Sequence, residues 1–255
     1  MKKDNSVNLS VATENLVILD NYLDNEFGRQ LIEQNKKEKE SHKSSGKLSA
    51  SQLGSPLQWQ ILKSFGIFER VIDDYTLRKF ERGKDIEKKY LENIPGVIEK
   101  QKFVEYRDCI GYMDAKVDTS TWEYPSGILP LEVKSVSNAK FKRIMGQCAP
   151  DRGHALQNAL YALAECTEYF AVSYIASDDY RVLTFILKTS DWKPKVDAII
   201  DRYQAQLKTE KVPVFIPEEK WQANPMYNPF PDWALSQEEI DEKFDKLLTE
   251  LTKEI

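Results

Sequence analysis

The chain has 255 residues, of which 41% are hydrophobic and 30% are charged, a composition typical of globular proteins. Its formal net charge of −5 argues against a protein that coats nucleic acid through a uniformly basic surface, so a bound nucleic acid would need a local basic patch. The first residues lack the apolar core of a secretory signal, and no apolar run has membrane-spanning length. We therefore expect a cytoplasmic protein without a membrane partner.

The cysteines and histidines restrict the metals that the chain can bind. Cys109, Cys148 and Cys166 are widely spaced, which favours a reducing compartment and argues against a structural zinc or a four-cysteine iron–sulfur cluster. His42 and His154 are the only histidines, so a histidine-rich metal site is excluded. Oxygen ligands remain, and they favour Mg²⁺ or Mn²⁺.

The first part of the chain predicts a helical arm over residues 1–45. Apolar residues recur there at helical spacing (Leu16, Leu19, Leu23, Phe27, Leu31 and Ile32) before a serine-rich stretch over residues 41–51. A core domain over residues 46–210 is expected to open with a helix that includes Leu48 and Leu53 and continues to Leu62, capped by Ser49 or Ser51. Residues 211–255 are expected to form a C-terminal wrap and helix.

A second helix is predicted over residues 74–93, ending at Pro95-Gly96. One face of it combines small and apolar residues with a single acid (Phe80, Gly83, Glu87, Tyr90 and Leu91). Glu87 has two open interpretations. It is either a rim residue paired with Lys84 or Lys88, or a metal ligand, because a buried carboxylate is costly unless it is paired or metal-bound.

Three strands should follow this helix. Strands over residues 97–106 and 109–117 are separated by Arg107-Asp108, which suits a hairpin, and a further strand spans residues 128–136. Pairing of the last two strands would bring Asp114 towards Glu132. Asp118 is a competing acid that we rank below Asp114.

The third strand carries the residues on which the functional prediction depends. Side chains alternate along a strand, so Glu132 and Lys134 share one face. The carboxylate can hold a divalent cation, and the ammonium can position an attacking water or stabilise charge on a phosphate. An acid and a lysine at this spacing also occur by chance on solvent-exposed strand faces. Whether Glu132 and Lys134 are functional therefore depends on the neighbouring segments.

A basic segment follows directly. Residues 134–152 contain five cations (Lys134, Lys140, Lys142, Arg143 and Arg152) and one acid, Asp151. In an acidic protein this reversal predicts a phosphate-facing loop, with a solvated flexible loop as the alternative.

The remaining segments alternate helices and strands. A helix over residues 153–167 buries Leu156, Leu160 and Leu163 and places Gln157 beside Tyr161. Strands over residues 170–176 and 181–188 and a helix over residues 193–207 come next. An aromatic, proline-rich wrap over residues 211–233 precedes a last helix that opens with a capping box over residues 236–239.

This order of residues resembles the PD-(D/E)XK nuclease superfamily, within it the RecB-type branch that includes lambda-type and CRISPR-associated exonucleases. Residues 83–87 are similar to the family's Gly-xxx-His/Glu helix, 111–114 to its Gly-x-x-Asp strand and 157–161 to its Gln-xxx-Tyr helix. Residues 48–53 are similar to the serine-rich segment that opens these domains. The resemblance covers about residues 48–190.

The resemblance implies an α/β fold, with a restriction-endonuclease-like mixed β-sheet flanked by helices and with helical N- and C-terminal extensions. It implies that Asp114, Glu132 and the Val133 carbonyl bind Mg²⁺ or Mn²⁺, and that Glu87 completes the shell or holds a second ion. Lys134 would activate the attacking water, while Gln157 and Tyr161 would contact the nucleic acid. Two departures are that Glu87 stands where His is commoner, and that the C-terminal region has no cysteines, so no iron–sulfur cluster is expected.

The implied function is a metal-dependent DNA exonuclease that serves recombination, repair or phage DNA processing, in a bacterium or encoded by a phage. Its partner would be single- or double-stranded DNA, with a homo-oligomer or a recombination protein as further partners. Two alternatives stay open. One is an endonuclease of restriction or junction-cleaving type on the same core, and the other is an inactive nucleic-acid-binding module.

Overall fold

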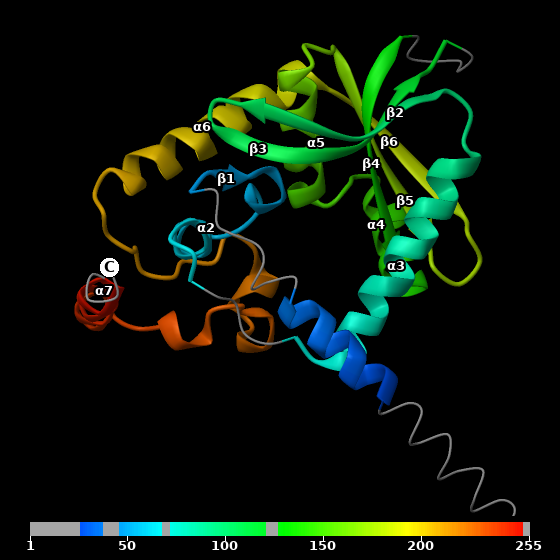
Figure 1. Cartoon of the computed structure of the whole chain (residues 1–255). Helices are drawn as coiled ribbons and strands as arrows, with labels where there is room; N and C mark the ends of the chain where they lie inside the picture. The colour runs from blue at the N-terminus through cyan, green and yellow to red at the C-terminus, as the bar shows by residue number, and fades with distance from the viewer. Residues whose placement is uncertain (1–25, 38–45, 68–71, 121–126, 252–255) are drawn as a thin grey trace, which may run out of the picture. The chain divides into compact units, whose positions relative to one another are not determined.

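The computed structural model describes residues 26–37, 46–67, 72–120 and 127–251, except for the side chains of residues 248, 250 and 251 (Figure 1). The described residues fall into two compact units, one made of 26–37 with 72–82 and the other of 46–67, 83–120 and 127–251. Helix α3 (Asp74–Asn93) contributes to both units. All the residues of the predicted site that the structure describes belong to the second unit.

The first unit is helical. A helix over residues 26–37 contacts the start of α3, where a Cβ added to Gly28 would lie 2.7 Å from an oxygen of Asp74. The Arg78 guanidinium lies 5.1 Å from the centre of the Phe27 ring. Helical structure is therefore present in the predicted arm over residues 26–37, and the rest of the predicted arm lies outside the described residues.

The second unit is built on a mixed sheet whose order is β1-β3-β4-β5-β6, with β2 paired to β3. Its strands are β1 (Leu48–Ser49), β2 (Val97–Tyr106), β3 (Cys109–Asp118), β4 (Ile128–Val136), β5 (Tyr169–Ala176) and β6 (Val182–Lys188). β3 runs antiparallel to β2 and β4, β4 runs parallel to β5, and β5 runs antiparallel to β6. The predicted strands are confirmed.

The hairpin between β2 and β3 has the expected turn. Arg107 and Asp108 have φ values of 50° and 62°, the left-handed conformation that a two-residue hairpin turn needs at both positions. The turn fixes the register of β3, with Tyr106 opposite Cys109 and Phe103 opposite Tyr112. It therefore decides which residues of β3 meet β4.

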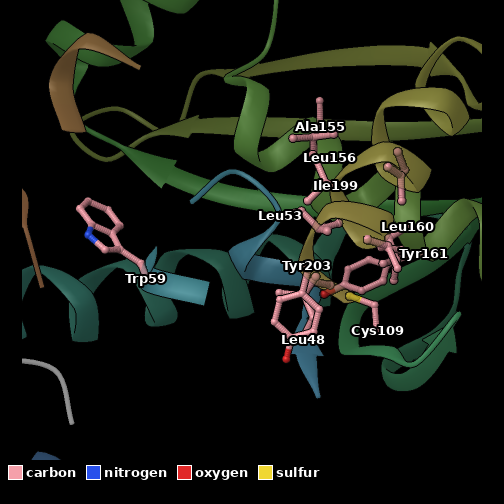
Figure 2. Close-up of a cluster of buried hydrophobic side chains, with 14 of the residues drawn as sticks. Leu48, Leu53, Trp59, Cys109, Ala155, Leu156, Leu160, Tyr161, Ile199 and Tyr203 are labelled. Atoms are coloured by element: carbon pink, nitrogen blue, oxygen red, sulfur yellow. The ribbon is translucent and has the colours of Figure 1, made fainter. Parts of the chain in front are cut away.

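Helices cover both faces of the sheet. The helices that follow α3 are α4 (Asn138–Gln147), α5 (Arg152–Ala164), α6 (Thr189–Leu207) and α7 (Gln237–Leu251), and α2 (Leu57–Ser64) precedes it. On one face Leu156 and Leu160 of α5 share a core with Val172 and Ile199, part of which Figure 2 shows. On the other face α3 packs Ile86 and Leu91 against apolar residues of β3, β4 and β5 (Ala115, Val117, Leu129, Leu131, Val133, Ala171 and Ile175). The predicted mixed sheet flanked by helices is confirmed.

The segment that opens the core domain differs from the prediction. Leu48 and Ser49 form the short strand β1, paired in parallel with Cys109 and Ile110, and a 3₁₀ helix follows over Ala50–Gln52. Ser49 makes no side-chain cap, and α2 begins only after Pro56. The prediction of one continuous helix was wrong because the partner strand that recruits Leu48 lies about sixty residues away, beyond the reach of local periodicity.

The basic segment also differs from the prediction. Residues Asn138–Gln147 form helix α4 rather than a loop. The Ser137 hydroxyl caps the helix by accepting a hydrogen bond from the Lys140 N–H, and Phe141 and Ile144, three residues apart, are buried. The sequence analysis did not recognise this helix, because its apolar stripe is short and lies among several charged residues.

The C-terminal residues pack on the core as short turns and one helix. The predicted capping box is present, because Glu239 accepts a hydrogen bond from the Ser236 N–H at 2.9 Å and the Ser236 Oγ accepts one from the Glu239 N–H at 3.5 Å. The buried Gln58 amide of α2 donates to the carbonyls of Pro213 and Trp233. The predicted boundaries of the core domain and the wrap stay predictions. Within the described residues, no helix has the length and apolar character needed to cross a membrane.

Candidate active site

The site lies where β3 and β4 separate. Their backbone pairing covers Ala115–Asp118 and Ile128–Leu131, whereas β4 continues to Val136 paired with β5. The N–H groups of Val133 and Ser135 therefore point into a gap that no described strand fills. Buried backbone groups need partners, so the gap must be closed by side chains.

Two carboxylates supply these partners. Asp114 Oδ2 accepts a hydrogen bond from the Val133 N–H at 2.9 Å, and Glu87 Oε1 accepts one from the Ser135 N–H at 2.8 Å. Helix α3 approaches this edge closely, since a Cβ added to Gly83 would lie 3.9 Å from Ser135 Cβ. In a strand the N–H and C=O of one residue point the same way, so the Val133 carbonyl also faces the gap.

Glu132 is the buried centre of the arrangement. Its side chain is 0% exposed and lies on the α5 face of the sheet with Lys134, whose Nζ is 2.5 Å from Glu132 Oε1. Neither Glu132 oxygen has a hydrogen bond of acceptable geometry among the described residues. Burial raises the pKa of Glu132 to about 8, and the Lys134 ammonium offsets only part of this effect.

The other charges respond to the same cluster. Burial raises the pKa of Glu87, against the opposing effects of the Ser135 N–H and of Lys134. Burial lowers the pKa of Lys134, but the carboxylates of Glu132 and Asp114 raise it further, so the net shift is upward and the ammonium stays charged. Three carboxyl groups thus lie around one cation, and the charges of Asp114 and Glu87 add to the effect of burial in raising the pKa of Glu132.

The donor set fits a hard divalent cation. Glu87, Asp114 and Glu132 all offer carboxylate oxygens. Neither Glu132 oxygen has a hydrogen bond of acceptable geometry from a described residue, although Lys134 lies beside one of them, and a divalent cation would relieve the repulsion between the acids. In the part of the chain that the structure describes, no three such side chains already stand as a ready-made metal cluster. The reason is visible in the contacts, because Asp114 and Glu87 face backbone amides while Glu132 faces Lys134.

Helix α5 brings its two motif residues together. Gln157 Nε2 donates to the Tyr161 hydroxyl at 3.1 Å, and Tyr161 is 1% exposed, within the cluster that Figure 2 shows. A Cβ on Gly111 would lie 2.8 Å from the Tyr161 ring, so this glycine lets β3 pass against α5. Tyr161 is thus a core residue, and its predicted contact with nucleic acid stays a prediction.

Two polar residues near the site were missed from the sequence. His154 Nδ1 and the Tyr174 hydroxyl are 2.9 Å apart, and that hydroxyl also accepts a hydrogen bond from the Asp151 N–H. Burial, together with Lys134 and Lys140, lowers the pKa of His154 to about 3, so the imidazole is neutral at pH 7. The sequence could have indicated that His154 lies near the site, because it precedes Gln157 by three residues and therefore shares its helix face.

The predicted phosphate-binding residues are partly paired with acids. Lys140 and Arg143 contact Asp151 at 2.6 and 3.1 Å, and Arg152 contacts Glu218 at 3.1 Å, whereas Lys142 is exposed on α4. Asp118 lies at the far end of β3, where it accepts a hydrogen bond from the Ser120 N–H. The structure therefore brings together Glu87, Asp114, Glu132 and Lys134, and it leaves Asp118 aside.

Comparison with known proteins identifies the fold. No family model matches the chain, and no curated protein sequence matches it. Among solved structures, LHK-Exo in complex with dAMP is similar with a TM-score of 0.50 and 11% identity, covering 65% of this chain and 89% of that chain. A second structure of LHK-Exo, an alkaline exonuclease from Laribacter hongkongensis, gives a TM-score of 0.45 at 11% identity and covers 66% and 92% of the two chains. SSO0001 gives a TM-score of 0.48 at 14% identity and covers 82% and 97%.

The chain therefore shares its fold with LHK-Exo, and its mixed sheet flanked by helices is the architecture that the sequence resemblance to the PD-(D/E)XK nucleases implied.

Proposed function

We propose that this protein is a metal-dependent nuclease that hydrolyses phosphodiester bonds in DNA. The observation that carries the proposal is Glu132, a fully buried carboxylate without hydrogen-bond partners of acceptable geometry among the described residues, whose oxygen lies 2.5 Å from the Lys134 ammonium. Asp114 on β3 and Glu87 on α3 both accept hydrogen bonds from the unpaired edge of β4. Burying such a cluster of charged groups lowers the stability of the fold, so stability alone does not account for it. Binding of a divalent cation and a phosphate would account for it.

The residues divide the chemistry among them. Asp114, Glu132 and the Val133 carbonyl would hold Mg²⁺ or Mn²⁺, and Glu87 would complete the shell. The bound cation would lower the pKa of its water and screen the phosphate. Lys134, kept protonated by its neighbours, would orient the attacking water and stabilise charge on the phosphate. Gln157 and Tyr161 would position the strand from α5, and the basic residues of α4 and Arg152 would bind flanking phosphates.

The finer assignment is a DNA exonuclease of recombination, repair or phage DNA processing that acts in the cytoplasm, alone, as a homo-oligomer or with a recombination protein. The motifs of the lambda-type branch support it, as does the similarity to a protein described as an alkaline exonuclease that has been crystallised with dAMP. A restriction-type endonuclease and an inactive binding module are the competing outcomes of the test.

The test is digestion of end-labelled single-stranded, end-labelled double-stranded and covalently closed circular DNA, with Mg²⁺ and with EDTA. Lys134→Ala should lower the Mg²⁺-dependent rate about 100-fold or more, as for the loss of one oxyanion donor. Lys47→Ala is the matched control, because Lys47 also contacts a glutamate, Glu105 at 2.6 Å, but on the surface. Cleavage of closed circles would favour an endonuclease. Absence of metal-dependent cleavage on all three substrates would refute the enzyme and leave a binding module.

A further inference from the structure

A cavity of about 470 Å³ lies on the α5 face of the sheet, between β6, the start of α6 and the segment that joins α4 to α5. Its volume falls in the range of small-molecule and nucleotide sites. The lining residues are Cys148, Ala149, Pro150, Arg152, Phe185, Ile186, Leu187, Trp192 and Lys195. None of the proposed catalytic residues lines it.

The cavity is nevertheless close to the proposed catalytic lysine. Lys134 on β4 is the register partner of Tyr174 on β5, and Val172 on β5 is the partner of Phe185 on β6. The Tyr174 and Phe185 rings are 6.1 Å apart, and Phe185 lines the cavity. Two strand spacings therefore separate Lys134 from the cavity wall, about 10 Å along one sheet face. Tyr174, which lies between them, is buried, so a nucleic-acid strand bound at Lys134 would have to pass over the surface of the protein to enter the cavity.

The walls combine aromatic surface with positive charge. Trp192 is partly exposed, and the Lys195 Nζ lies 4.1 Å from the centre of a Trp192 ring. Arg152 and Lys195 are the charged lining residues, and none of the lining residues is acidic. Glu218 contacts Arg152, but it also contacts Arg202, so one carboxylate is shared between two guanidinium groups. The lining residues themselves therefore carry a positive excess.

We propose that this cavity binds one unpaired nucleobase of the substrate strand. The base would stack on Trp192, and Arg152 and Lys195 would contact the phosphates beside it, the combination by which proteins bind single strands without reading their sequence. This inference rests on the proposed function and refines its substrate. A base held in the cavity is not paired, so the strand that reaches it must be single-stranded or frayed.

The first test measures binding in EDTA, so that cleavage does not interfere. Fluorescence anisotropy compares an oligothymidine with an oligomer of equal length in which every residue is abasic, which keeps the phosphates and removes the bases. Trp192→Ala should weaken oligothymidine binding roughly 5- to 100-fold and leave abasic binding unchanged. Trp192→Phe, which keeps an aromatic ring against Phe170, should retain most of the affinity. Trp221→Ala, a half-exposed tryptophan of the C-terminal wrap, is the control.

The second test uses Cys148, an exposed thiol on the cavity wall. In a Cys166→Ser background Cys148 should react with maleimide while Cys109 stays inert, because Cys109 is buried and burial raises its pKa to about 12. Saturating oligothymidine should slow the alkylation of Cys148 several-fold, and the abasic oligomer should slow it less. This readout does not depend on catalysis.

The outcomes separate the two proposals. If the wild-type protein cleaves and binds DNA but Trp192→Ala binds like Trp221→Ala, or Cys148 is not protected, the cavity inference fails and the nuclease stands. Protection by free thymidine monophosphate but not by oligothymidine would make the cavity a nucleotide site and overturn the strand proposal. If the wild-type protein neither binds nor cleaves any DNA, both proposals fall.

Discussion

Two effects act in opposite directions on the pKa of Glu132, and without a bound metal its carboxyl group is protonated at neutral pH. Burial raises the pKa of its carboxyl to about 8, although the Lys134 ammonium lies beside it. The approach of Asp114 towards Glu132 was predictable from the sequence, through the hairpin and the strand pattern, as was the shared strand face of Glu132 and Lys134. Its complete burial and the capping of Val133 and Ser135 were not, because they depend on where β3 leaves β4.

The first prediction concerns the pH dependence of stability without metal. An acid whose pKa is higher in the folded state contributes stability that is fully present below its unfolded value near 4.5 and is lost as the pH rises to about 8. Glu132→Gln should remove this contribution, so the variant should gain stability relative to wild type as the pH rises from 5 to 9. Urea unfolding in EDTA measures the difference. Glu105→Gln, at an exposed ion pair, is the control, and a constant difference between Glu132→Gln and wild type would contradict the buried acid.

The second prediction separates the two interpretations of Glu87. Glu87→Gln keeps an oxygen that can accept from the Ser135 N–H, so its free energy of unfolding should stay near wild type. The lost charge should raise the Mg²⁺ concentration for half-maximal cleavage by about 10- to 100-fold, the usual effect of weakening a metal site. Metal titration of the cleavage rate tests this. An unchanged metal requirement would make Glu87 a structural cap of β4.

At the scale of elements, α5 holds the site together because it crosses both parallel strands. Its buried Asn158 donates from Nδ2 to the carbonyls of Pro130 on β4 and Ala171 on β5, at 3.2 and 2.6 Å. The periodicity of leucines predicted this helix, and alternation predicted the strands. Periodicity did not reveal β1, whose partner is distant in sequence, or α4, whose apolar stripe is two residues long.

The third prediction follows from the role of Asn158 between these elements. Asn158→Ala leaves two buried carbonyls without their amide donor and should lower the free energy of unfolding by about 1–3 kcal/mol. The same change at Asn93, whose amide contacts Lys89 on the surface of α3, should have little effect. Urea unfolding of both variants gives the comparison. Equal stabilities would mean that α5 is held by its apolar contacts alone.

At the scale of the whole molecule, an acidic chain must concentrate its positive charge to bind DNA. The net charge is −5, and several cations near the site are paired with acids such as Asp151 and Glu218. Binding should therefore depend on a few phosphate contacts, with a shallow dependence on salt. The composition predicted that a nucleic acid would need a local basic patch. That several of these basic residues are paired with acids became apparent only from the structure.

The fourth prediction measures how many phosphates the cavity residues contact. For single strands the logarithm of the binding constant falls with the logarithm of salt concentration by about 0.7 for each phosphate neutralised. Replacing Arg152 and Lys195 together by glutamine should reduce the slope for oligothymidine by about 1.4, because both cations would lose their phosphates. The pair Lys47→Gln and Lys208→Gln removes the same charge at two positions outside the cavity lining and should change the slope much less. Equal slopes for the two double variants would show that only the net charge of the protein matters, and that the cavity contacts no phosphate.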